Sequence, residues 1–226
     1  MANVIRSQAI ILRRTDYGEA DRILQLLTPD HGKISLIAKG VRKEKSKLAG
    51  GIELFAISDI GFIAGKSDIG TLTGARLDKY FSHIVEDYDR TQLAYEAIKQ
   101  ISRAAESVTE AAFFELLKQL FAALDDHKLS LQLVETWFWL QLNILLGLGL
   151  NLTTDSSGMK LVEDSDYEFD ETDMSFVYRP DGRFTTDHIK LLRLLSARPP
   201  QVAAQVRGVD QLTPEVAWLA RSLSPK

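Results

Sequence analysis

Apolar and polar residues alternate in short segments along the first third of the chain. Turns that contain Gly or Pro, such as residues 28–32, separate these segments. Alternation with a period of two is typical of strands that bury one face. Closing such strands into a barrel leaves no strand edge exposed, so the pattern favours a small OB-like β-barrel. The expected strands cover residues 4–13, 22–27, 33–38, 52–63 and 69–72.

From residue 77 onward the apolar positions recur three or four residues apart, as on one face of a helix. Asp87 or Asp89 is the expected N-cap of the first helix, whose apolar stripe includes Leu93 and Ala97. Residues 107–110 have the spacing of a capping box and predict the start of a second helix. Further helices are expected over residues 129–146, from Asp187, and from Thr213, where a capping hydroxyl precedes Pro214.

Residues 151–186 interrupt this helical pattern. The stretch is polar and acidic, and Met174, Phe176 and Tyr178 alternate just before a turn at residues 180–182, which indicates a β-hairpin. We therefore predict an α+β fold with two domains. Residues 1–76 form an OB-fold nucleic-acid-binding domain, and residues 77–226 form a helical domain with an irregular acidic insertion at about 151–186.

Charge is distributed unevenly along the chain. The formal net charge is -4, but residues 1–50 contain ten Lys/Arg against five Asp/Glu, a local charge of +5 that leaves -9 for the remainder. This asymmetry favours a basic binding module on an acidic scaffold. The chain has no Cys, which excludes disulfides, thiolate metal sites and cysteine nucleophiles and fits a cytoplasmic protein. The uncharged run 136–154 is long enough for a membrane span, but its Gln, Asn and Gly residues favour a buried helix.

The most basic segment is the loop at residues 39–47, which contains five cations and one carboxylate between two expected strands. Loops between strands stay in contact with water, so these cations should face solvent together. Their mutual repulsion is relieved by a polyanion, and we therefore predict that the loop binds nucleic-acid phosphates. The alternative is a solvated hairpin tip without a ligand.

Signals for catalysis are weak. Residues 61–67 resemble a phosphate-binding P-loop, but only three residues separate the two glycines where that motif needs four, although Lys66 could still contact a nucleic-acid backbone. The histidines His31, His83, His127 and His188 are scattered, without metal-ligand spacing. The acidic stretch lacks the central Gly and the terminal Glu of an EF-hand. We therefore expect that this protein is not an enzyme.

Four segments together resemble one known family. They are Ala9-Ile10-Ile11-Leu12-Arg13-Arg14, Tyr17-Gly18-Glu19-Ala20-Asp21-Arg22-Ile23-Leu24, Leu27-Thr28-Pro29-Asp30-His31-Gly32-Lys33 and Ala38-Lys39-Gly40-Val41-Arg42. Through about residue 75 these segments are similar to the RecO family of bacterial DNA repair and recombination mediators. The remainder of the chain is similar only in the order of its elements.

The resemblance implies an OB fold, a helical C-terminal domain and a bacterial protein associated with the nucleoid. It also implies binding of single- and double-stranded DNA, annealing of complementary strands, and loading of a RecA-type recombinase onto DNA coated by single-strand-binding protein. The implied partners are a RecR-like protein and the C-terminal tail of that coating protein. Many members carry a four-cysteine zinc module whose first pair would fall near Asp155 and Gly158. We expect no cofactor here, and packing alone should hold residues 151–186.

We expect DNA phosphates to be neutralised by Arg13, Arg14, Lys39, Arg42, Lys43, Lys45 and Lys47. Arg42 is expected to have the largest single effect, because Arg can contact a phosphate through two donors. A different function is also open: the helical domain could bind an acidic partner peptide while the barrel acts as a spacer. The weaker candidates for that site are Lys99, Arg103 and Lys118, which lie on expected helices beside apolar residues.

Overall fold

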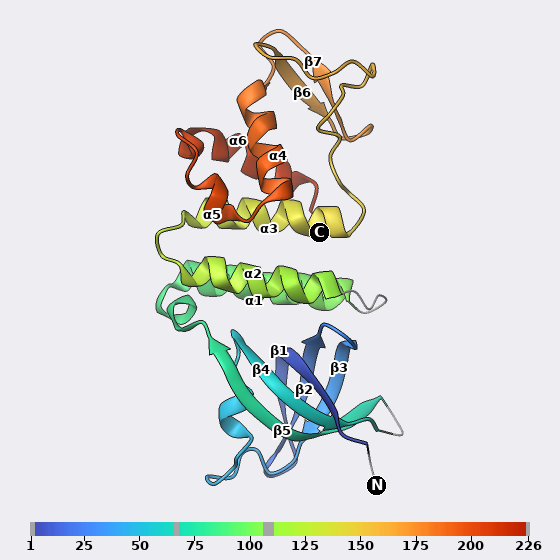
Figure 1. The fold of residues 1–226 in the computed structure, drawn as a ribbon, viewed down its shortest axis with the longest axis vertical. Helices are drawn as coiled ribbons and strands as arrows, with labels where there is room; N and C mark the ends of the chain where they lie inside the picture. Colours follow the sequence, from blue (N-terminus) through green and yellow to red (C-terminus); the bar gives the residue numbers. More distant parts are fainter. Residues whose placement is uncertain (1–2, 66–67, 106–110, 225–226) are drawn as a thin grey trace. The chain divides into compact units, whose positions relative to one another are not determined.

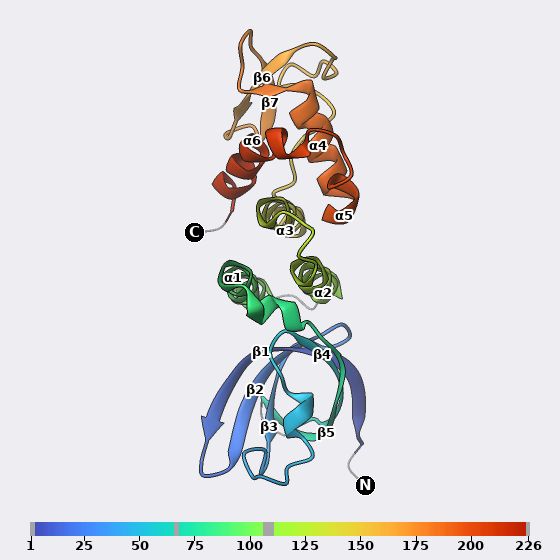
Figure 2. The same ribbon diagram turned by 90° about the vertical axis from the view of Figure 1, so that its left-hand side faces the viewer.

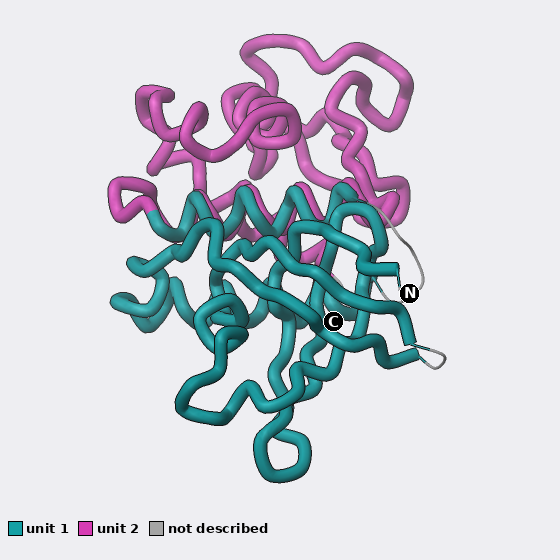
Figure 3. The backbone as a smooth tube through the Cα atoms, turned by 60° about the horizontal axis from the view of Figure 1, so that its bottom comes forward, with its two compact units in different colours: residues 1–125 teal, residues 126–226 magenta. Residues whose placement is uncertain are grey.

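The computed structural model describes residues 3–65, 68–105 and 111–224. The chain divides into two compact units, residues 1–125 and 126–226 (Figure 3). This division differs from the expected domain boundary between residues 76 and 77. The first unit contains the barrel together with the two helices that follow it, because aromatic side chains pack between them.

The first unit begins with a closed five-stranded barrel (Figure 1). Its strands pair in the order β1-β2-β3-β5-β4; β3 and β5 run parallel, and the other neighbours run antiparallel. This OB-like arrangement confirms the predicted barrel. Alternate residues of each strand point inward, and Ala9, Leu24, Leu36 and Leu72 are among the buried core residues. The strands are β1 (Ile5–Tyr17), β2 (Asp21–Thr28), β3 (Gly32–Ala38), β4 (Ala56–Ile63) and β5 (Ile69–Tyr80).

Helices α1 (Tyr88–Ala104) and α2 (Ala111–Asp125) lie next to one end of the barrel (Figure 2). The Asp87 carboxylate accepts a hydrogen bond from the Arg90 backbone N–H, which confirms Asp87 as the N-cap of α1. The Phe55 ring contacts Tyr95 of α1 edge-on at 5.0 Å and Phe121 of α2 at 5.8 Å. These contacts attach both helices to the barrel. The predicted capping box at residues 107–110 lies outside the described residues.

The second unit is mainly helical. Its helices are α3 (Leu131–Leu145), α4 (Thr186–Ala197), α5 (Pro200–Ala203) and α6 (Val209–Ser222). Polar side chains of α3 join it to its neighbours: Gln141 donates to the Leu195 carbonyl, and the buried Asn143 amide donates to the Ala220 carbonyl. In the described part of the chain, no helix has both the length and the apolar character needed to cross a membrane.

The acidic insertion contains a three-stranded sheet in the order β7-β6-β8, which includes the predicted hairpin. The strands are β6 (Asp166–Asp170), β7 (Ser175–Tyr178) and β8 (Phe184–Thr185). Tyr167, Phe176 and Phe184 are buried in its small core. The Asp155 carboxylate also closes a turn by accepting the N–H groups of Ser157 and Met159, each at 2.9 Å. Packing is therefore supplemented by local hydrogen bonds.

Two elements differ from the expectations. The strand expected to end at residue 72 continues to Tyr80, because residues 74–80 pair with β4 although their side chains are mostly polar. The last helix begins at Val209, not at Thr213 as predicted. Thr213 is buried inside it and donates its hydroxyl to the Val209 carbonyl at 2.7 Å, so the Thr-Pro pair is not the start of this helix.

Candidate nucleic-acid interface

The basic loop between β3 and β4 is attached firmly to the barrel. Val41 lies in the barrel core, and Leu48 packs against it. The Asp21 carboxylate accepts the Gly40 N–H at 2.7 Å, and the Ala20 carbonyl accepts the Arg42 N–H at 2.9 Å. Apolar anchors and backbone hydrogen bonds therefore fix the base of the loop, while its long polar side chains point to solvent.

Four lysines of this loop are exposed: Lys39, Lys43, Lys45 and Lys47. None of them forms an ion pair with any residue that the structure describes. The one carboxylate within the loop, Glu44, is likewise exposed. The structure therefore presents four lysine ammonium groups from nine consecutive residues, without neutralising partners among the described side chains. Such a surface attracts polyanions.

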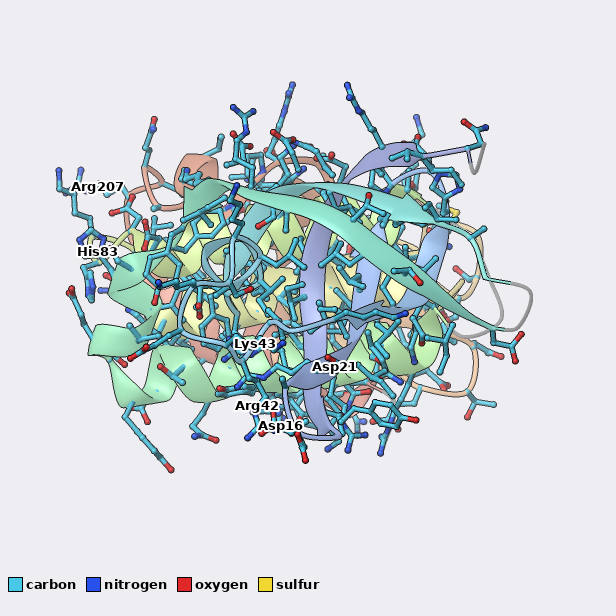
Figure 4. The ribbon with its side chains drawn as sticks, turned by 90° about the horizontal axis from the view of Figure 1, so that it is seen from below. Asp16, Asp21, Arg42, Lys43, His83 and Arg207 are labelled. Carbon is cyan, nitrogen blue, oxygen red and sulfur yellow. The ribbon has the colours of Figure 1, made fainter. Side chains whose placement is uncertain are left out.

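Arg42 differs from these lysines because it contacts a carboxylate. Its Nε lies 3.5 Å from an Asp16 oxygen at the end of β1, and its Nη1 donates to the Gly18 carbonyl at 3.4 Å. Figure 4 shows Asp16, Arg42 and Lys43 close together, with Asp21 beside them. The hydrogen bond from Arg22 lowers the pKa of Asp16, and the positive charge of Arg42 adds to this effect. An exposed ion pair of this kind is weak, so a phosphate can compete for Arg42.

The two arginines of β1 also differ from each other. Arg14 is half-buried, forms an ion pair with Glu53 at 3.1 Å and donates to the Ile52 carbonyl. Arg13 is exposed and forms no ion pair with the described residues. Five of the seven predicted DNA contacts are therefore unpaired in the described structure: Arg13, Lys39, Lys43, Lys45 and Lys47.

A groove of about 650 Å³ lies between the barrel and α1, within the first unit. It brings together residues that the sequence had assigned to two different sites: Arg13 and Arg14 from β1, and Lys99 and Arg103 from α1. The third peptide candidate, Lys118, does not line it. Lys118 lies on α2 and pairs with Glu115 one helical turn away at 3.4 Å.

Sequence reasoning missed Tyr95, Gln25 and Lys33, which also line this groove. One signal was present, because Tyr95, Lys99 and Arg103 are spaced four residues apart and so share one face of a helix. The contribution of the barrel could not be found in the same way. It depends on how β1 and β3 pack against α1, and the Lys33 ammonium donates to the Ser102 carbonyl across that junction at 3.1 Å.

The other chemical candidates remain separate. The described residues contain no group of three His, Asp or Glu side chains that could hold a metal ion. His188 is buried and caps α4, where its Nδ1 accepts the Thr185 N–H at 3.0 Å. In the P-loop-like segment, Gly61, Phe62 and Ile63 belong to β4, whereas Lys66 and Ser67 lie outside the described residues. Asp155 and Gly158, at the position of the first zinc cysteine pair, form a hydrogen-bonded turn and do not provide the thiolates of that module.

The part of the sequence that forms the barrel and its basic loop is similar to known proteins. Residues 1–81, which include all five strands and the loop, match the family model described as recombination protein O N terminal. The resemblance to the RecO family is confirmed. DNA repair protein RecO of Dehalococcoides mccartyi strain CBDB1 is 40% identical over 122 residues, which cover 54% of this chain and 48% of that protein. The protein of the same name from Rubrobacter xylanophilus is 33% identical over 142 residues, or 63% of this chain and 57% of its own.

The matches with RecO proteins cover part of this chain and part of each relative. The family model covers the barrel, and the chain spans about half the length of the curated Dehalococcoides relatives it matches. The segment of this chain that the family model matches is therefore the barrel with its basic loop.

Proposed function

We propose that this protein is a DNA-binding recombination mediator that acts in DNA repair. It binds single- and double-stranded DNA, anneals complementary strands and assists recombinase loading onto DNA coated by single-strand-binding protein. The observation that carries this proposal is the set of four exposed lysines, Lys39, Lys43, Lys45 and Lys47, held on an OB-like barrel without ion-pair partners among the described residues. The similarity to proteins named DNA repair protein RecO supports it.

Annealing requires two strands of like charge to approach each other. Lysine ammonium groups neutralise backbone phosphates and release condensed counterions, so the repulsion between the strands falls. These contacts read no base sequence, which suits a protein that acts on any complementary pair. The role needs binding without chemical conversion, and we propose no cofactor.

The proposed partners follow from the same family resemblance. They are a RecR-like protein and the C-terminal tail of single-strand-binding protein, with a RecA-type recombinase loaded indirectly. Pull-down of purified partners by the full chain tests each one separately. Binding of an acidic tail peptide without any binding of DNA would instead support the adaptor function, in which the barrel is a spacer.

The salt dependence of DNA binding tests the central proposal. Five phosphate contacts on a single strand predict a slope of log K against log salt near -3.5, a roughly hundredfold loss of affinity from 50 to 200 mM salt. Replacing Lys39, Lys43, Lys45 and Lys47 together with Gln removes four of these contacts, and each lost contact should make the slope shallower by about 0.7. Fluorescence anisotropy with a labelled oligonucleotide measures both slopes.

The matched control is Arg207→Gln in the second unit, where Arg207 is exposed and forms no ion pair with described residues (Figure 4). It should leave the slope unchanged. Strand annealing on oligonucleotides coated with single-strand-binding protein should slow for the four-lysine variant and not for the control. An unaltered slope and annealing rate in the four-lysine variant would reject the proposed interface.

A further inference from the structure

The groove between β1 and α1 combines features that a bare phosphate site does not need. Tyr95 lies at its wall with 46% of its surface exposed, and its ring is supported edge-on by the buried Phe55 ring at 5.0 Å. Leu12, Leu54 and Ile98 add apolar surface, and Gln25 and Ser102 add hydrogen-bonding groups. A supported and exposed aromatic ring in such a groove is suited to a flat, partly apolar ligand.

The charge of the groove indicates that this ligand is an anion. Arg13 and Arg103 line it, both are exposed, and neither has an ion pair with the described residues. Lys99 also lines it and pairs only with Glu96 on its own helix, at 3.4 Å. Among the described residues that line the groove there is no Asp or Glu, and the hydrogen bond from Gln100 lowers the pKa of Glu96, the partner of Lys99. The cations of the groove therefore exceed its carboxylates.

We propose that this groove binds an unpaired stretch of DNA, with one base stacked on Tyr95 and the adjoining phosphates contacted by Arg13 and Arg103. The proposal rests on the proposed function, because it assigns the single-strand-selective part of DNA binding to a place separate from the basic loop. The loop contacts backbone phosphates of either form of DNA. The groove requires an exposed base face, which a duplex does not offer because its bases stack on one another.

Two observations favour a nucleic-acid strand over an acidic peptide in the groove. The first is continuity, because β1 carries Arg13 beside the groove and Asp16 three residues further on, where Asp16 contacts Arg42 of the basic loop. A strand that leaves the groove along β1 thus reaches the loop cations. The second is composition: an aromatic platform alternating with arginines is the combination that single-strand-binding sites use.

Substitution of Tyr95 tests the stacking contact. Tyr95→Ala should weaken binding of a single-stranded oligonucleotide by roughly 5- to 150-fold, the range for loss of one stacked base, and should leave duplex binding unchanged. Tyr95→Phe keeps the aromatic ring and should bind the single-stranded oligonucleotide as tightly as the unsubstituted protein does. The control is Tyr88→Ala, which removes a 75% exposed tyrosine from the first turn of the same helix and does not line the groove.

An abasic oligonucleotide separates stacking from charge. The unsubstituted protein should bind it more weakly than a normal strand, and Tyr95→Ala should remove that difference. If Tyr95→Ala impairs folding, judged by circular dichroism, Arg103→Glu serves as the second variant and should weaken single-strand binding more than duplex binding.

The outcomes distinguish this inference from the proposed function. If the four-lysine loop variant loses all DNA binding while Tyr95→Ala weakens single-strand and duplex binding equally or not at all, the groove inference is wrong and the loop proposal stands. If Tyr95→Ala abolishes binding of an acidic peptide but leaves oligonucleotide binding intact, the groove is a peptide site and the inference is overturned. Selective loss of single-strand binding in Tyr95→Ala supports it.

Discussion

Asp16 should compete with DNA phosphates for Arg42 of the basic loop, the surface at which we propose that DNA binds. Its carboxylate lies 2.8 Å from Arg22 Nε and 3.5 Å from Arg42 Nε. Asp16→Asn removes the negative charge and keeps an acceptor for Arg22, so it releases Arg42 toward solvent. We expect this variant to bind DNA more tightly than the unsubstituted protein, because one further arginine can contact a phosphate.

The size of the effect follows from the single additional phosphate that Arg42 can neutralise once Asp16 is uncharged. One such phosphate on a single strand makes the salt slope steeper by about 0.7, so the advantage of the variant should grow about threefold as salt falls from 200 to 50 mM. Titrations by fluorescence anisotropy at four salt concentrations measure this change. The hydrogen bond from Arg22 holds the pKa of Asp16 below its ordinary value, so the carboxylate is ionised at neutral pH and the substitution changes a full charge.

A matched substitution on the same barrel checks that the effect is local. Asp59→Asn breaks the exposed ion pair with Arg76, at 2.7 Å on β4 and β5, and it should leave the slope unchanged. Thermal unfolding of both variants checks that they fold. An Asp16→Asn protein that folds normally but has the same or a shallower slope would contradict the placement of phosphates at this end of β1.

Two further predictions concern stability. Burial lowers the pKa of His188, and the negative charges of Glu215 and Asp187 offset this shift only in part. The unfolded chain therefore takes up a proton first as pH falls below about 6.5, so the free energy of unfolding should decrease from pH 7.5 to 5.5, and His188→Gln should flatten this dependence. Urea unfolding followed by Trp fluorescence measures it, because Trp137, Trp139 and Trp218 all lie in the second unit. A Cβ on Gly51 would lie 2.5 Å from the Ala75 carbonyl carbon, whereas a Cβ on Gly50 would meet nothing within 4 Å. Gly51→Ala should therefore destabilise the barrel by about 1–3 kcal/mol, measured by calorimetry. An equal loss of stability in Gly50→Ala would contradict this explanation by steric clash.

The pattern of the sequence was sufficient to predict the barrel but not the full length of its strands. Alternating apolar positions mark a strand only while one face is buried, and the distal part of β5 is exposed from Arg76 to Tyr80. Backbone pairing with β4 extends the strand there, and that pairing leaves no apolar signal. At α6, the local Thr213-Pro214 signal was overridden by packing, because Val209 is buried one turn earlier.

The site was predictable in the same partial way. Five cations in nine residues identified the loop, because solvent exposure of a strand connection follows from local rules. The partners of Arg14 and Arg42 could not be identified in this way, since Glu53 and Asp16 reach them only through strand pairing and the path of the loop. The groove required the packing of α1 against the barrel, which no spacing along the chain encodes. The two-donor geometry of Arg42 favours it as a phosphate contact, but its ion pair with Asp16 makes the unpaired lysines the better first targets for substitution.

The two proposed contacts together account for an asymmetry that an annealing protein needs. A protein that holds single strands only through phosphates would hold the duplex product at least as well, because the duplex carries more charge per unit length. A base stacked on Tyr95 is available only before pairing. When the complementary strand pairs with it, the stacking contact is lost, and the duplex should be held roughly 5- to 150-fold more weakly at the groove than the unpaired strand was. In the proposed mechanism the loop lysines would gather strands of either form, while the groove would favour the substrate over the product and so promote release of the annealed DNA.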